Sequence, residues 1–204
     1  MRLSLIFLFF CSIVLFGNDE AEIFIAKLSE SMKPTASLTA NFVQKRTFPD
    51  VDMELITKGE FAIDGDGRMC WEIKEPLHCI AILTKEKLLQ WDDQSNKKIE
   101  LGAKDIPWLQ LLYKQFSDWT LGNITGMAKG YQVSKTGEYT LRFEPESTLQ
   151  KEYVSMIELT FSDTLDSVKS ILIQEKGGDT AVIEFSDIKL NSTIPEERWI
   201  LPEK

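Results

Sequence analysis

The chain has little of what enzymes commonly use for catalysis. Histidine occurs once among the 204 residues, at position 78, so a metal site built from several histidines is excluded. There is no phosphate-binding glycine loop, dinucleotide fingerprint or cysteine spacing typical of zinc sites. A hydrolase built on His78 stays open, because a catalytic triad is assembled in space from distant residues. We interpret His78 as a partly buried structural residue, and we expect no enzyme activity, no cofactor and no metal.

Positive charge is also scarce. The chain carries 23 Lys and Arg against 32 Asp and Glu, which gives a formal net charge of −9 at pH 7. An acidic body argues against nucleic acid as a partner and against electrostatic docking on an anionic membrane. Low-complexity tracts, clear repeats and Pro- or Gly-rich linkers are absent from the sequence. We therefore expect a single domain over residues 18–204.

Only one long hydrophobic run is present. It extends from Leu3 to Phe16 and is shorter than the about 20 apolar residues that a membrane-spanning helix needs. Arg2 precedes the run, and the polar stretch Asn18–Glu20 follows it. This order of basic, apolar and polar segments is typical of a secretory signal peptide, which we place at residues 1–17. An N-terminal anchor or a buried helix is the alternative.

Cysteine is rare as well. The chain has three cysteines, and removal of the signal peptide leaves Cys70 and Cys79. A turn centred on Lys74–Glu75 would place these two directly opposite each other in a hairpin. Directly opposed residues have β-carbons about 4.5–5.5 Å apart, near enough for a disulfide after a modest adjustment. We predict a disulfide between Cys70 and Cys79, with two reduced thiols in the core as the alternative.

What the mature chain does have is alternating hydrophobicity. Leu38, Ala40 and Phe42 alternate with Thr39 and Asn41, which predicts a strand. Apolar residues at helical spacing predict one helix before Pro34 and a second over residues 107–116. Further strands are predicted at residues 53–63, 68–73, 79–83, 87–91, 98–101, 130–134, 139–143, 154–161, 168–175 and 180–187. The pattern indicates an α+β, mainly β fold with a strongly curved antiparallel sheet or open barrel.

Several short motifs follow one another in order along this pattern. They are Ala36–Lys45 (ASLTANFVQK), Lys58–Phe61 (KGEF), Cys70–Pro76 (CWEIKEP), Lys87–Asp92 (KLLQWD) and Ile200–Pro202 (ILP). In order and spacing they resemble the periplasmic outer-membrane lipoprotein carrier family (LolA/LolB-like). In that family an apolar, small, aromatic alternation runs into a Gln-Lys pair, and a Trp is followed five residues later by a Pro. The resemblance covers nearly the whole mature chain.

The resemblance implies an incomplete β-barrel around an apolar cavity, with helices as a lid. Members of the family take acylated lipoproteins from an inner-membrane ABC transporter and pass them to an outer-membrane acceptor. We therefore expect a periplasmic monomer that carries the acyl chains of lipoproteins. Elementary energetics agree, because each exposed acyl CH₂ costs about 0.8 kcal/mol in water and a soluble carrier must bury the chain.

Alternation and family position together predict the lipid-binding residues. Met69, Trp71 and Ile73 share one face of their strand, and we expect this face to point into the cavity. The predicted wall consists of Leu38, Phe42, Phe61, Ile63, Met69, Trp71, Ile73 and Trp91, and the predicted lid residues are Trp108, Leu109 and Leu112. Ordinary core packing is the alternative for each of these residues.

One stretch departs from the family pattern. Where carriers of lipoproteins often have an Arg-Pro pair whose arginine helps to hold the lid closed, this chain has Gly65-Asp66. The nearest arginine is Arg68, an alternative latch whose side chain is expected on the face opposite Trp71. A diverged relative that carries another envelope lipid or glycolipid therefore stays open, as does a structural envelope protein with a packed barrel.

Overall fold

The computed structural model of the protein describes residues 17–102 and 107–202. All but the last residue of the predicted signal peptide, 1–17, lies outside the described residues, so the signal peptide stays a prediction. Within the described part of the chain, no helix is long and apolar enough to cross a lipid bilayer.

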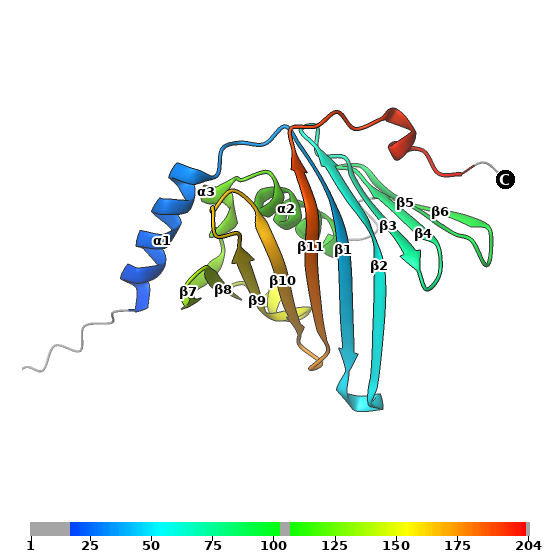
Figure 1. Ribbon diagram of the computed structural model, residues 1–204. Helices are drawn as coiled ribbons and strands as arrows, with labels where there is room; N and C mark the ends of the chain where they lie inside the picture. The colour runs from blue at the N-terminus through cyan, green and yellow to red at the C-terminus, as the bar shows by residue number, and fades with distance from the viewer. Residues whose placement is uncertain (1–16, 103–106, 203–204) are drawn as a thin grey trace, which may run out of the picture.

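Eleven strands form one open antiparallel sheet (Figure 1). Its order is β6-β5-β4-β3-β2-β1-β11-β10-β9-β8-β7, so two meanders are joined where β1 pairs with β11, and the edge strands β6 and β7 do not pair with each other. The strands are β1 (Ser37–Phe48), β2 (Met53–Asp64), β3 (Met69–Glu75), β4 (Cys79–Leu83), β5 (Lys87–Asp92), β6 (Lys97–Gly102), β7 (Tyr131–Gly137), β8 (Thr140–Pro145), β9 (Val154–Phe161), β10 (Val168–Glu175) and β11 (Thr180–Leu190). The prediction of a mainly β fold on an unclosed antiparallel sheet is confirmed.

Alternation along each strand decides which side chains point to which face of the sheet. In β1, Leu38, Ala40 and Phe42 are buried, whereas Asn41 and Val43 are exposed. We call the face that carries Phe42 the inner face and the opposite one the outer face. The buried core of the inner face includes Leu38, Phe42, Phe61, Ile63, Met69, Leu141, Phe143, Ile157, Leu159, Phe161, Ile171, Ile183 and Phe185.

Helices cover the inner face. The first, α1 (Gly17–Ser31), packs along β7, and the ring of its Phe24 lies 6.0 Å from that of Phe161. The second, α2 (Pro107–Thr120), lies behind the sheet in Figure 1, and its Trp119 is buried in the inner core. The remaining short helices are α3 (Ile124–Met127), α4 (Thr148–Lys151), η1 (Pro49–Val51) and η2 (Glu196–Trp199).

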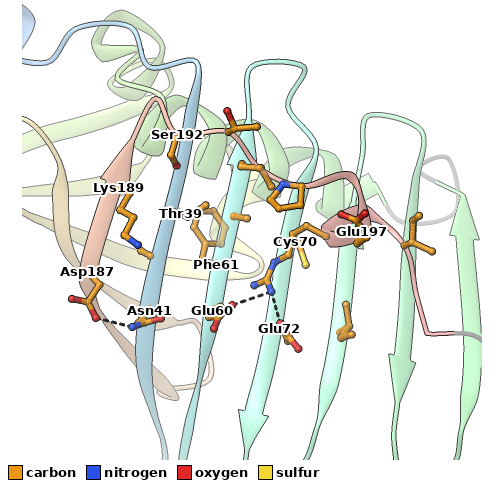
Figure 2. A pocket seen from close by; sticks show the side chains of 18 of the residues that line it. Thr39, Asn41, Glu60, Phe61, Cys70, Glu72, Asp187, Lys189, Ser192 and Glu197 are labelled. Atoms are coloured by element: carbon orange, nitrogen blue, oxygen red, sulfur yellow. Dashed lines mark hydrogen bonds and ion pairs between the residues drawn. The ribbon is translucent and has the colours of Figure 1, made fainter.

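A second, smaller core lies on the outer face. Cys70, Ile82 and Trp91 point to this side, and Trp199 and Leu201 from the end of the chain pack on them. We call residues 191–202 the C-terminal segment. Figure 2 shows this segment in front of the strands and the helices behind them. The two faces of the sheet are therefore covered by different parts of the chain.

The register of β3 and β4 contradicts the predicted disulfide. Cys70 pairs with Ile82, whereas Cys79 pairs with Ile73. Directly paired residues point to the same face, so the two thiols lie on opposite faces of the sheet, and both are free. The prediction was wrong because it centred the turn on Lys74–Glu75. Both residues still belong to β3, which ends at Glu75, so the turn comes after them.

Gly59 marks the point where β2 bends against β3. The register between these strands shifts between Lys58 and Gly59. A β-carbon at Gly59 would lie 1.8 Å from the carbonyl oxygen of Glu72 and 2.9 Å from Cζ of Phe42. Only glycine allows the two backbones and the Phe42 ring to approach so closely.

Substitution of Gly59 is expected to be costly. We expect Gly59→Ala to lower the free energy of unfolding by about 2 kcal/mol, because the new methyl group overpacks a site bounded by backbone. Urea denaturation measures this. Gly177→Ala is the matched control, since a β-carbon there meets no atom within 4 Å. Equal stabilities for the two variants would contradict the register of β2 and β3.

Candidate functional site

An aromatic cluster occupies the centre of the inner face. Trp71 pairs directly with Phe61 across β3 and β2, and their ring centroids lie 5.4 Å apart. The Trp71 ring also lies 4.2 Å from that of Phe42 and 6.4 Å from that of Phe185. Because Phe42 pairs with Phe185, the cluster joins the two meanders of the sheet. It forms a broad apolar surface with no ionised group of its own.

The predicted wall residues come together on this face, with one exception. Leu38, Phe42, Phe61, Ile63 and Met69 are buried in the inner core, and Trp71 and Ile73 are half-buried against it. The shared face of Met69, Trp71 and Ile73 is thus as predicted. Their position fits both a ligand wall and ordinary core packing.

Trp91 is the exception. In β5 it pairs with Ile80, and its ring belongs to the outer core together with Cys70 and Ile82. Its indole N–H donates a hydrogen bond to Oδ1 of Asn96 at 3.0 Å. The placement of Trp91 in the inner wall was wrong, because the alternation in β5 has the opposite phase to the one that its family position suggested.

The predicted lid residues Trp108, Leu109 and Leu112 belong to α2, but their side chains lie outside the described residues. Two other residues attach α2 to the inner face. Trp119 is buried in the core, and Tyr113 is half-buried against it. The Tyr113 hydroxyl reaches the β2–β3 turn at Gly67, where a β-carbon would lie 1.9 Å from Oη.

Sequence reasoning missed several half-buried apolar residues of the inner face. Leu83 pairs with Met69 at the end of β4, and Val133 and Ile173 lie on β7 and β10. The signal was weak in β4, because Cys79–Leu83 is apolar at every position and alternation cannot select a face.

The C-terminal segment encloses a groove of about 940 Å³ against the outer face. Arg198 in this segment forms ion pairs with two strands, from Nη1 to Oε2 of Glu60 at 3.0 Å and to Oε2 of Glu72 at 2.5 Å (Figure 2). Nε2 of His78 lies 2.8 Å from the other oxygen of Glu72. Farther along the groove, Asn41 donates a hydrogen bond to Asp187. The C-terminal segment is thus attached to the outer face by ion pairs in addition to the apolar contacts of Trp199 and Leu201.

Arg68 belongs to the same arrangement. Its guanidinium forms ion pairs with Asp64 at 2.7 Å and with Glu196 at 2.9 Å, and it lies 4.7 Å above the ring of Trp199. These contacts secure the C-terminal segment. Arg68, which the sequence offered as a substitute for the arginine that holds the family's lid closed, therefore lies on the face of the sheet away from α2.

Electrostatics and burial shift the pKa of several groups here. The hydrogen bond from Lys74, together with the charge of Arg198, holds the pKa of Glu60 below its ordinary value in spite of burial. Arg68 lowers the pKa of Glu196 in the same way. Burial raises the pKa of the Cys70 thiol to about 11, which leaves it largely protonated and slow to react at neutral pH.

Of the groups that a hydrolase built on His78 would need, the structure supplies one, an acid beside the histidine. Glu72 supplies an acid beside His78, but this carboxylate is also paired with Arg198. The ring of His78 packs edge-on against Trp91 at 5.2 Å. Among the described residues, no Ser, Thr or Cys hydrogen-bonds to His78, and no three potential ligands come together as a metal site.

Known proteins resemble this chain in sequence and in fold. The family model described as "Outer membrane lipoprotein carrier protein LolA" matches residues 33–199. An outer-membrane lipoprotein carrier protein of Legionella pneumophila (strain Lens) is 24% identical over 195 residues, which cover 95% of this chain and 91% of that protein.

Two solved structures share the fold. An uncharacterized conserved protein from Thermus thermophilus has a TM-score of 0.50 at 9% identity, over 91% of this chain and 94% of that one. A putative outer membrane lipoprotein-sorting protein domain from Vibrio parahaemolyticus has a TM-score of 0.50 at 7% identity, over 89% and 96%. At such identities the likeness concerns the fold alone.

Removal of the Arg198 side chain is expected to loosen the C-terminal segment. In a Cys79→Ser background, we expect Arg198→Ala to speed the reaction of Cys70 with Ellman's reagent by about tenfold, because hydrogen bonds between charged groups that close the segment are lost. Lys189→Ala, in the same groove, is the control and should leave the rate unchanged. An unchanged rate in Arg198→Ala would show that the ion pairs do not hold the segment.

Acid is expected to weaken the same attachment. Because Glu60 and Glu196 have lowered pKa values in the folded protein, their contribution to stability is present above the ordinary pKa of 4.5 and is lost as the pH falls through the lowered values. Calorimetric melting between about pH 6 and about pH 3 measures the loss. We expect a shallower decline in Glu196→Gln than in the unmodified protein, and identical declines would contradict this assignment.

Proposed function

The chain belongs to the outer membrane lipoprotein carrier (LolA) family, and on this premise we propose that it binds the acyl chains of a lipoprotein against the inner face of its sheet. We propose further that it does so in the periplasm, as a monomer, after removal of residues 1–17. The donor would be an inner-membrane ABC transporter and the recipient an outer-membrane acceptor.

One observation carries this proposal. Apolar side chains that are only half-buried border the inner core, among them Trp71, Ile73, Leu83, Val133 and Ile173. Such side chains still have apolar surface to offer to a ligand. Each acyl CH₂ that moves from water onto apolar surface contributes about 0.8 kcal/mol, so a fatty chain needs no ionic contact to bind.

The contacts that attach α2 to the inner face are of a kind that an acyl chain can replace. α2 is attached through Trp119 in the core and through Tyr113 against the core and the β2–β3 turn. An acyl chain can replace apolar contacts of this type, because it presents the same chemistry to the same surface. We propose that α2 moves when cargo binds, whereas the ion-paired C-terminal segment on the outer face stays in place.

The identity of the cargo has a second candidate. The inner face supplies apolar surface for an acyl chain, and Arg68 lies on the other face with Asp64 and Glu196. Because Arg68 does not lie on the inner face, that face favours recognition of the acyl chain itself over recognition of the part of the cargo to which the chain is attached. Another acylated envelope lipid or glycolipid is therefore the alternative cargo.

We also propose that the protein is not an enzyme. The family is one of carriers. The acid next to His78 is shared with Arg198, an arrangement that suits a structural ion pair.

A lysine on the inner face is expected to abolish carriage selectively. We expect Leu83→Lys to weaken binding of the fluorescent fatty acid cis-parinaric acid by about tenfold or more, because a charge then lies against the acyl chain. Fluorescence titration measures this. Leu89→Lys is the matched control, since Leu89 is also half-buried but belongs to the outer core.

Similar affinities for Leu83→Lys and the unmodified protein would rule out the inner face as the binding surface. Weakening by Leu89→Lys alone would move the site to the outer face. Native mass spectrometry of protein purified from the periplasm provides the second readout, with co-purified acylated cargo as the expected result.

A further inference from the structure

Exposed apolar side chains gather on the β1–β2 hairpin. Five of the eleven large apolar residues that are exposed in the described part of the chain lie on this hairpin, with exposed fractions from 40% to 67%: Val43, Val51, Met53, Leu55 and Ile56. By register, Met53 and Leu55 point to the inner face and Val43 and Ile56 to the outer face, so the hairpin exposes apolar side chains on both of its sides. Single apolar residues on a surface are normal, but several on one projecting hairpin favour an interaction site. Figure 1 shows the tip of the hairpin projecting beyond the ends of the neighbouring strands.

The same hairpin has an open backbone edge. β1 is paired with β11 as far as Thr47, whereas β3 pairs with β2 only from Lys58 onward. On the side away from β1, no described strand lies beside Met53–Thr57. The N–H and C=O groups of such an edge are a template for another strand.

The other two edges of the sheet are protected. β7 is covered by α1. β6 carries one exposed apolar residue in its middle, Ile99, but Lys97, Lys98 and Glu100 flank it, and charged residues of this kind discourage pairing with another chain. The edge at Met53–Thr57 has the opposite character, since Met53, Leu55 and Ile56 are apolar and exposed.

We propose that Met53–Thr57 accepts an extended segment of a partner protein as an added β-strand. Backbone hydrogen bonds would supply affinity, and alternate apolar side chains of the segment would contact Met53 and Leu55. The inference goes beyond the carrier proposal and stands whether or not an acyl chain binds.

Charge indicates that the segment is basic. The tip carries Asp50, Asp52 and Glu54, and the basic residues of the hairpin already have carboxylate partners: Arg46 pairs with Glu175 at 2.5 Å and Lys58 with Glu75 at 3.0 Å. Lys45 pairs with Glu54 at 2.6 Å, but both side chains remain about half exposed, at 48% and 54%. A segment with Lys or Arg opposite Glu54 complements this surface, whereas an anionic membrane does not.

A second copy of the chain is a poor occupant. Antiparallel pairing with Leu55 opposite Leu55 would bring the other copy's Asp52 beside Lys58, where Glu75 already pairs. In the next symmetric register, in which each copy is shifted by one residue toward its hairpin tip, Glu54 of one copy lies opposite Glu54 of the other. Like charges directly opposite each other destabilise a strand pair.

The test is a titration of isotope-labelled protein with an acetylated, amidated hexapeptide of alternating lysine and valine, followed by NMR. We expect shifted amide signals and slowed hydrogen exchange confined to Met53–Thr57 and the strand beside it. Glu54→Lys should weaken binding by about fivefold, because one favourable cross-strand pair becomes unfavourable. A glutamate–valine hexapeptide should bind this variant better than it binds the unmodified protein.

Glu100→Lys is the matched control, because Glu100 lies on edge strand β6 and pairs with Lys87 at 3.0 Å, as Glu54 pairs with Lys45. It should leave the affinity unchanged. Equal binding of a peptide with N-methylated backbone would overturn the proposal, since it would exclude strand addition. So would shifts centred on β6, or association of the protein with itself through Met53–Thr57.

Discussion

The antiparallel pairing of β1 with β11 is the contact on which the rest of the structure depends. It joins two meanders that are distant in sequence, and it places Phe42 directly opposite Phe185. Through Phe42 the aromatic cluster extends to Trp71 in one meander, and through Phe185 it continues into the other. Without this pairing each meander would keep its strands but lose the continuous inner face.

A single open sheet has two faces, and each needs a cover of its own. On the inner face the cover is helical and apolar, with Phe24 and Trp119 packed on side chains of the strands. On the outer face the cover is the C-terminal segment, which Arg68 and Arg198 fasten by ion pairs and hydrogen bonds. Because apolar contacts lack direction, the inner cover is the one that a ligand of similar chemistry can replace.

The sequence was most informative where alternation was clean. The shared face of Met69, Trp71 and Ile73, the antiparallel meanders and the first helix followed from periodicity alone. The family match added Leu38 and Phe42 on the same side. These positions needed only local information, since the direction of a side chain in a strand is set by its neighbours.

The failures concern information that is not local. The predicted disulfide depended on the centre of one turn, and an error there moved Cys70 and Cys79 to opposite faces. Trp91 failed for another reason, because its place in the wall came from the family match, whereas the alternation in β5 puts its side chain on the outer face. The role of the C-terminal segment was not predicted, since its pairing partners Glu60 and Glu72 are more than a hundred residues away in sequence.

The central claim is that a fatty chain lies on the inner face of the sheet. Intermolecular nuclear Overhauser effects between a bound fatty acid and the methyl groups of isotope-labelled protein test it most directly, because they arise only between protons in direct contact. The account predicts such effects at Ile73 and Leu83 on the inner face and none at Ile82 and Leu89 on the outer face. Effects at Ile82 and Leu89 without any at Ile73 and Leu83 would contradict it.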